Sequence, residues 1–418
     1  MSLAEETAVV RVATAGSVDD GKSTLIGRLL FDCKALLTDQ LDHVEKASVR
    51  RGFARTELAL VTDGLRAERE QGITIDVAWR YFATAKRRFI MADTPGHVQY
   101  TRNMVTGAST ADVAVVLIDA ARGPTDQTRR HLFISAMLAV PRVIVAVNKM
   151  DRVGFAEARY SELAQQAAES FKDGGGLGEI TTVPICALRG DNIVERSVDM
   201  PWYSGPTLLD LLESSSRPAR VEGPGRLPIQ WVIRPQDEKF HDYRGLAGRV
   251  ADGTLRVGES ILVLPAGATS KITAIEVSGE SRDSATAGDS TIVHLEDDID
   301  ASRGDLLVSS EGAPLPVEAI EAEVCWMTTT PLRPGARLTA KHTTRRVRAV
   351  VDEIVYRRDV GSGTTSPAKE LQLNDLGRIK IRLAGPLCVA PYSLSRALGS
   401  VLLIDESTGE TVGAAMVR

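Results

Sequence analysis

The chain has 418 residues, of which 43% are hydrophobic and 25% charged, with a formal net charge of −5. This length can form two or three domains, and the acidic balance argues against a protein dedicated to binding nucleic acid through a basic surface. The sequence has no apolar run long enough to cross a bilayer, no signal-peptide pattern at its start and four scattered cysteines without metal-ligand spacing, so we expect a cytoplasmic protein with reduced thiols.

The first half of the chain alternates apolar runs with stretches of helical spacing. Nearly continuous runs rich in Val and Ile, typical of strands buried on both faces, occur at residues 9–16, 88–96, 111–120, 142–150 and 181–188. Apolar residues with helical spacing occur at residues 23–32, 99–108, 128–138 and 157–171, and a closing helix is expected at 206–215. The alternation predicts a doubly wound, mostly parallel α/β domain over residues 1–216.

The stretch GSVDDGKST follows the first predicted strand and opens the first predicted helix. Two glycines separated by four residues, followed by a lysine and a serine, form the phosphate-loop pattern, in which backbone N–H groups point at phosphate oxygens. We expect Lys22 to contact the β- and γ-phosphates and Ser23 to bind Mg²⁺. The alternative is a glycine turn before an amphipathic helix. The predicted loop consists of Gly16, Ser17, Val18, Asp19, Asp20, Gly21, Lys22, Ser23 and Thr24.

Two further stretches could complete the phosphate end of the site. In GITID, residues 72–76, Thr74 could close over the nucleotide and bind Mg²⁺, although the string is by itself an ordinary strand former. In DTPGH, Asp93 could hold Mg²⁺ through water and the Gly96 N–H could meet the γ-phosphate. His97 stands where a water-positioning group belongs; the alternative is a surface or core histidine. The predicted contacts in this stretch are Asp93, Thr94, Pro95, Gly96 and His97.

The motif NKMD ends the predicted strand at 142–150 and points to the base. It consists of Asn148, Lys149, Met150 and Asp151. The Asp151 carboxylate can accept from both N1–H and the exocyclic amine of guanine, whereas adenine offers neither donor there. A site built on such a buried acceptor can reject the wrong base about 10⁴-fold. The alternative is a polar strand exit without a ligand.

The second half of the chain changes character. A stretch rich in Pro, Gly and Arg at residues 217–228 predicts a linker. After it, short β-rich runs alternate with turn signals, which indicates β-barrels or sandwiches. The expected domains cover residues 226–311 and 317–418, with a joint near 309–319.

The four motifs, in this order and spacing, resemble the translational-type GTPase superfamily, to which elongation factor Tu belongs. The resemblance implies a GTPase domain followed by two β-barrels, and GTP with Mg²⁺ as ligands. It also implies that Val18 and Ile73 form an apolar gate beside His97, and that Asp19 is a ligand for a monovalent cation.

The resemblance also places a fifth guanine element late in the GTPase domain. That element is usually Ser-Ala-Leu in the superfamily, and this chain has Cys186, Ala187 and Leu188 there. The main contact with guanine is expected from the Ala187 N–H. Cys186 replaces the serine whose hydroxyl buttresses the site.

Longer strings are similar to the large, GTPase subunits of heteromeric bacterial sulfate adenylyltransferases. They lie at residues 63–82, 200–213, 297–307, 373–381 and 402–417, so the resemblance covers essentially the whole chain. It implies a small partner subunit, in a heterodimer or larger assembly, that binds ATP and sulfate and forms adenylyl sulfate and pyrophosphate. The chain lacks the SGGxDS-like pyrophosphatase loop of such small subunits, which places adenylyl transfer on the partner. GTP hydrolysis by this chain would drive that uphill nucleotidyl transfer.

The resemblance leaves alternatives open. Some members carry an adenylylsulfate kinase domain with a second phosphate loop; this sequence has no such string, so the chain either lacks that domain or is a piece of a fusion. Neither nucleic acid nor a membrane is expected as a partner. The rival interpretations are a translational GTPase whose barrels hold aminoacyl-tRNA and a GTP-binding scaffold without turnover.

Overall fold

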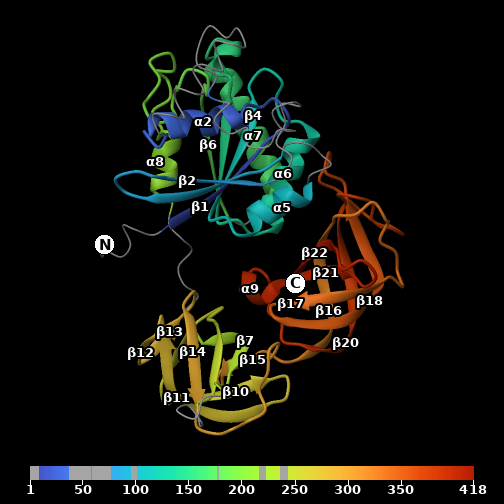
Figure 1. Cartoon of the computed structure of the whole chain (residues 1–418). Helices are drawn as coiled ribbons and strands as arrows, with labels where there is room; N and C mark the ends of the chain where they lie inside the picture. The colour runs from blue at the N-terminus through green and yellow to red at the C-terminus, as the bar shows by residue number, and fades with distance from the viewer. Residues whose placement is uncertain are drawn as a thin grey trace. The chain divides into compact units, whose positions relative to one another are not determined.

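The computed structural model describes residues 9–36, 58, 77–95, 101–176, 178–215, 223–235 and 243–418. These residues form two compact units (Figure 1). The first unit comprises Met1–Pro218 and Val360–Thr364, and the second comprises Ala219–Asp359 and Thr365–Arg418. None of the helices described in these ranges is long and apolar enough to cross a membrane.

The first unit is built on a six-stranded sheet with the order β2-β3-β1-β4-β5-β6. Its strands are β1 (Val9–Ala15), β2 (Ala78–Ala83), β3 (Arg88–Asp93), β4 (Val113–Asp119), β5 (Arg142–Asn148) and β6 (Glu179–Pro184). Only β2 runs antiparallel to its neighbour, at one edge of the sheet. The chain places β3 on one side of β1 and β4 on the other, so the carboxyl end of β1 is the topological switch point, where such sheets bind ligands.

Helices cover this sheet because their apolar residues face it (Figure 1). They are α2 (Lys22–Asp32), α5 (Thr101–Ser109), α6 (Asp126–Met137), α7 (Glu157–Asp173) and α8 (Leu208–Glu213), with a 3₁₀ turn η3 (Met150–Val153) after β5. Leu25, Ile26 and Leu29 of α2 pack in one buried cluster with side chains of the sheet. Thr125 caps α6 by accepting from the Thr128 amide, which fixes where that helix begins.

The second unit contains two β-barrels. Strands of the first are β7 (Arg226–Ile233), β8 (Gly245–Arg249), β9 (Thr254–Arg256), β10 (Ser260–Leu264), β11 (Ala268–Val277), β12 (Glu280–Arg282), β13 (Ser284–Thr286), β14 (Ser290–Leu295) and β15 (Leu306–Ser309). The order β10-β15-β7-β8-β14-β11 closes through pairing of β10 with β11. Alternate residues of these strands point inward and form the barrel's own apolar core.

The second barrel closes in the same way. Its elements are β16 (Val317–Trp326), β17 (Arg337–His342), β18 (Arg345–Arg358), β19 (Thr365–Ser366), β20 (Leu376–Leu387), α9 (Arg396–Gly399), β21 (Ser400–Asp405) and β22 (Thr411–Val417). The order β17-β21-β22-β16-β20-β18 closes through pairing of β17 with β18. A small apolar cluster joins the barrels, with Leu306 and Val308 from the first and Cys388, Ala390 and Leu398 from the second.

The structure confirms the predicted fold class, an elongation factor Tu-like GTPase domain followed by two β-barrels, while the predicted domain boundaries stay a prediction. It also corrects details. Strand β2 was not among the predicted strands, because only Phe82 of its side chains is buried. The predicted linker at 217–228 extends too far, since β7 begins at Arg226 and pairs there with β15. All four cysteines are free thiols, as expected.

Candidate functional site

The loop between β1 and α2 lies directly against the carboxyl ends of neighbouring strands. Gly21 has φ +96, and a Cβ there would lie 2.5 Å from Nδ2 of Asn148 at the end of β5. Gly16 has φ +151, and a Cβ there would lie 3.1 Å from Cβ of Leu117 in β4. Both the backbone conformation and the space therefore require glycine. The result is a tight loop that leads into the amino terminus of α2, a geometry suited to an anion.

Lys22 is the cation at the centre of this loop. Its side chain is 7% exposed, and its ammonium donates to the carbonyl oxygens of Gly16 at 2.8 Å and Ser17 at 3.0 Å. Burial lowers the pKa of Lys22, and the nearby carboxylates of Asp93, Asp20 and Asp19 act against that shift. A buried ammonium held by neutral carbonyls is a ready partner for phosphate oxygens.

Asp20 holds the phosphate loop in shape through hydrogen bonds to other residues of the protein. Its Oδ2 accepts from the Ser17 amide at 2.7 Å, and its backbone oxygen accepts from Nδ2 of Asn148 at 2.8 Å. Burial raises the pKa of Asp20, opposed by the Ser17 hydrogen bond and by Lys22. The Ser17 hydroxyl in turn lies 2.5 Å from the hydroxyl of Thr125, the cap of α6. These bonds hold the loop in shape and tie it to β5 and α6.

The predicted magnesium ligands are only partly described. Ser23 lies in the first turn of α2 and Asp93 ends β3, so both stand at the edge of the sheet where the loop lies. Asp93 is 1% exposed and interacts electrostatically with Lys22. Within the described ranges no group of three His, Cys, Asp or Glu side chains could hold a metal ion. Of the predicted ligands, the described residues therefore provide one hydroxyl, that of Ser23, and one carboxylate, that of Asp93.

Several predicted residues lie outside the described residues: Ile73, Thr74, Gly96 and His97. Of their neighbours, Thr94 is fully buried and its hydroxyl donates to the carbonyl oxygen of Thr14, at 2.5 Å. That bond attaches the segment after β3 to β1.

Asn148 and Lys149 connect the phosphate loop to the rest of the site. The Asn148 side chain donates to the Asp20 carbonyl and accepts from the Ala187 amide at 2.9 Å. The Lys149 ammonium donates to the Asp19 carbonyl and to Oδ2 of Asp119 at 2.8 Å. The contact of the Ala187 N–H with guanine, which the resemblance implied, stays a prediction; in the structure this N–H donates to Asn148. Two motifs far apart in sequence are thus joined side chain to backbone.

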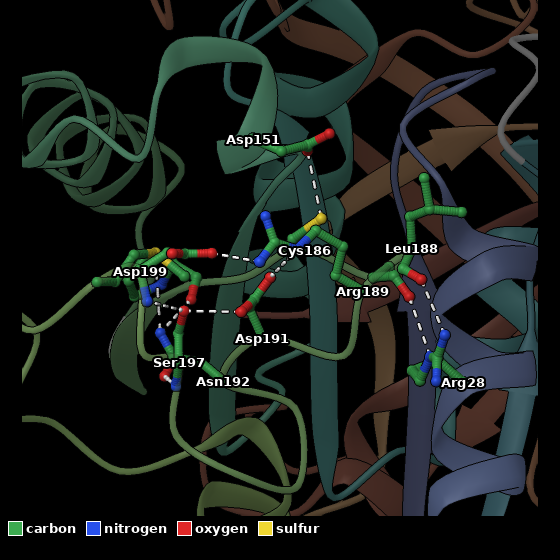
Figure 2. Close-up of polar contacts among 12 residues, drawn as sticks. Arg28, Asp151, Cys186, Leu188, Arg189, Asp191, Asn192, Ser197 and Asp199 are labelled. Atoms are coloured by element: carbon green, nitrogen blue, oxygen red, sulfur yellow. Dashed lines mark hydrogen bonds and ion pairs between the residues drawn. The ribbon is translucent and has the colours of Figure 1, made fainter.

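Asp151 and Cys186 form the base end of the candidate site (Figure 2). The Cys186 thiol is 1% exposed and donates to Oδ1 of Asp151 over 3.2 Å, whereas Asp151 itself is exposed. Burial raises the pKa of Cys186 to about 12, so the group stays a thiol at neutral pH. Cys186 therefore donates to Asp151 from the position where the resemblance expects a serine hydroxyl. Each carboxylate oxygen can accept more than one hydrogen bond, so both Asp151 oxygens can still accept from a ligand.

The loop that follows is held by its own polar contacts (Figure 2). Arg189 pairs with Asp191 at 3.3 Å and with Asp199. The Ser197 hydroxyl donates to Asp191 at 2.7 Å. On the other side, Arg28 of α2 donates to the carbonyl oxygen of Leu188 at 2.8 Å. The segment at 186–188 is thereby fixed from both sides.

Sequence reasoning missed Asp119, Thr125 and Arg28. Asp119 ends β4 and is fully buried. Burial acts to raise its pKa, but hydrogen bonds from Lys149 and from the amides of Ala121 and Arg122 keep the value below its usual range. Its place at the carboxyl end of a predicted strand was the signal that could have found it.

Comparisons with known proteins agree with this geometry. Residues 7–218 match the family model of the elongation factor Tu GTP binding domain, and residues 319–418 match the GTP-eEF1A C-terminal domain-like model. The chain is 44% identical over 417 residues to a protein of Salmonella paratyphi C named sulfate adenylyltransferase subunit 1, covering 99% of this chain and 86% of that one. It is 46% identical over 416 residues to the protein of the same name from Aeromonas hydrophila subsp. hydrophila, with the same coverage.

The chain also matches proteins that have other names. The chain is 48% identical over 418 residues to the bifunctional enzyme CysN/CysC of Mycobacterium tuberculosis, covering 98% of this chain and 67% of that one. Among solved structures, sup35 in complex with GDP aligns over 100% of this chain and 96% of its own, at 22% identity and a TM-score of 0.44.

Proposed function

Because this chain belongs to the family of sulfate adenylyltransferase subunit 1, whose GTP-binding domain is of the elongation factor Tu type, we propose that it hydrolyses GTP to drive sulfate activation on a partner. The partner would be a small subunit that binds ATP and sulfate. There a sulfate oxygen would attack the α-phosphorus of ATP, forming adenylyl sulfate and releasing pyrophosphate. That transfer is uphill, and hydrolysis of GTP by water to GDP and phosphate would supply the free energy.

The single observation that carries the GTP site is the continuous set of bonds from the phosphate loop to the base end. Lys22, bonded to the Gly16 carbonyl, would meet the phosphates, and Asp151, bonded to the Cys186 thiol, would meet the base. Asn148 joins the two by bonding to both Asp20 and Ala187. One nucleotide can therefore meet a buried cation at one end and a supported carboxylate at the other.

The residues fit Mg·GTP chemically. Lys22 and the backbone N–H groups of the loop would hold the phosphates, and Ser23, Asp93 and Thr74 would supply oxygens to Mg²⁺. When bound, Mg²⁺ neutralises charge on the phosphates. The exposed carboxylate of Asp19, whose backbone is held by Lys149, would offer an oxygen to a monovalent cation. His97 would position the attacking water, with Val18 and Ile73 as an apolar gate.

Coupling requires that the GTP and GDP forms interact differently with the partner. The segments around Thr74 and Asp93 to His97 would change with the γ-phosphate. The barrels of the second unit would serve as the rigid platform, since each has its own closed strand order and apolar core. Linkage for binding is reciprocal, so a GTP analogue should also change the partner's affinity for ATP or sulfate.

The test is a reconstituted assay of this chain with the co-expressed small subunit. Phosphate from GTP and pyrophosphate from ATP are followed together, with and without sulfate. We expect slow GTP hydrolysis by the chain alone, acceleration by the small subunit, and the largest rate when ATP and sulfate are present. If pyrophosphate release were indifferent to GTP and GTP turnover indifferent to the small subunit, the coupling would be wrong. Aminoacyl-tRNA binding in place of coupling would then favour the translational interpretation.

A further inference from the structure

A second site of positive charge lies in the other unit, at the junction of the two barrels. A cavity of about 550 Å³ is lined by Arg303, Gly304, Lys341, Thr344, Arg345 and Arg346. We name these six residues the interbarrel pocket. The first two precede β15 of one barrel, and the other four belong to the β17–β18 hairpin of the other.

A contact between the barrels holds one lining residue of the interbarrel pocket, Arg345, in place. Arg345 pairs with Asp305 at 3.2 Å, and Asp305 in turn accepts from the Ser302 amide at 2.9 Å. The buried ring of His342 lies with Nε2 2.9 Å from the Leu398 carbonyl oxygen, next to the apolar cluster that joins the barrels. The pocket is therefore formed before any ligand arrives, which reduces the cost of binding.

The positive charges of the lining outnumber the carboxylates that pair with them in the described part of the chain. It contains four cations, in a chain whose net charge is −5. Within the described ranges, Asp305 is the carboxylate that pairs with one of them, Arg345, while Lys341 and Arg346 have no ion pair. Such a concentration of like charge around a concavity attracts anions.

Two polar atoms of the lining are buried without a partner. Nε of Arg345 and Oγ1 of Thr344 have almost no exposed area and make no hydrogen bond to any residue that the structure describes. Leaving buried donors unpaired costs free energy, and such groups call for an explanation. The side chains that carry these two atoms both line the pocket, together with Lys341, whose ammonium has no ion pair in the described part of the chain.

We propose that the interbarrel pocket binds a diphosphate group, either as inorganic pyrophosphate or as the end of a nucleoside diphosphate. Three uncompensated cations match the charge of a diphosphate. The planar fork of arginine suits phosphate oxygens in pairs. A concave site of about 550 Å³ has the size of small-molecule sites, whereas a protein or RNA partner would need a broader surface. The pocket consists of residues of the second unit alone, and the proposal does not rest on the proposed function.

The experiment is calorimetric titration of the whole chain, its GTP site saturated with GDP and Mg²⁺, with inorganic pyrophosphate and separately with ADP. Arg346→Ala and Lys341→Ala should each weaken binding about tenfold or more, the loss expected for one charge-assisted hydrogen bond. Arg348→Ala is the matched control. Arg348 is exposed on the same strand, has no ion pair in the described part of the chain and does not line the cavity. It should leave affinity within about twofold, because nearby charges outside the site act only weakly in salt.

The titrations with pyrophosphate and with ADP distinguish a free diphosphate anion from the diphosphate end of a nucleotide. Pyrophosphate binding as tightly as ADP would identify the free anion, and tighter binding of ADP would identify a nucleotide; both would support the site. Orthophosphate should bind more weakly than either. Absence of binding, or equal losses in Arg346→Ala and Arg348→Ala, would overturn the proposal. Binding of a polyglutamate peptide without binding of pyrophosphate would also overturn it and indicate a protein-docking surface.

Discussion

The buried thiol of Cys186 donates a hydrogen bond to Oδ1 of Asp151 over 3.2 Å (Figure 2). Cys186→Ala removes the donor and should weaken binding of a fluorescent GDP analogue by about two- to tenfold, the range for one neutral hydrogen bond. Cys186→Ser keeps a donor and should stay near the wild type. An affinity of Cys186→Ala equal to that of the wild type would mean that the thiol does not support Asp151.

Asp151 should determine the choice of base. Asp151→Asn replaces one carboxylate acceptor by an amide N–H that would face a donor of guanine, so GTP should bind at least about a hundredfold more weakly. The affinity of this variant for xanthosine triphosphate should rise, because the 2-oxo group of xanthine accepts a hydrogen bond from the amide. Competition binding with GTP, ATP and xanthosine triphosphate measures this. Equal affinity of the wild type for ATP and GTP would refute the assignment.

Lys22 and His97 should separate binding from turnover. Lys22→Ala removes the buried charge of the phosphate loop and should abolish detectable GTP binding at micromolar nucleotide. His97→Ala should bind GTP nearly normally and hydrolyse it about a hundredfold or more slowly, because positioning of water contributes to the rate and not to affinity. Equilibrium binding and single-turnover phosphate release distinguish the two. If His97→Ala hydrolysed GTP at the wild-type rate, a group other than His97 would position the attacking water.

Lys149 should matter through its bond to Asp119. Lys149→Ala removes the cation nearest to the fully buried Asp119 carboxylate, at a cost of about 1–3 kcal/mol in stability. It should also weaken GDP binding because the Asp19 carbonyl loses its donor. Arg152→Ala is the control, since Arg152 is 3.9 Å from the same carboxylate and 61% exposed. Urea unfolding and GDP affinity of the two variants should differ clearly; similar values would show that the bond contributes little.

His131 should make the first unit sensitive to acid. Its ring is fully buried in α6 beside Gln127. Burial, together with the cations Lys22 and Arg130, lowers its pKa to about 3, against about 6.5 in an unfolded chain. Between these values the unfolded chain binds one more proton, so stability falls as pH drops below about 6.5, by at most about 1.4 kcal/mol per pH unit.

Hydrogen exchange of the α6 and β4 amides between pH 7 and pH 5, corrected for the intrinsic pH dependence of exchange, measures this stability in the first unit alone. The same measurement on His131→Gln isolates the contribution of this ring. In the variant, the slope of stability against pH should be smaller than in the wild type, by at most the amount that one proton contributes. An identical slope in both proteins would mean that His131 does not remain neutral on folding.

The sequence alone was enough to predict the class of fold. The order of strands and helices follows from local periodicity, and the phosphate loop lies within nine consecutive residues from Gly16 to Thr24. The motifs at 16–24, 93–97 and 148–151 stand at the ends of predicted strands, and parallel strands bring such ends to one edge of the sheet. The nucleotide contacts at Ser23, Thr74, Asp93 and His97 stay predictions.

Only the tertiary structure decided which distant residues touch. Cys186 is 35 positions from Asp151, and no local pattern indicates that its thiol donates to that carboxylate. The Ala187 amide donates a hydrogen bond to the Asn148 side chain, and β2 pairs with β3 as an antiparallel edge strand. Arg303 and Arg346 share one pocket. Such contacts depend on which strands become neighbours and in which register, a choice made by packing of the whole core and not by any short stretch of chain.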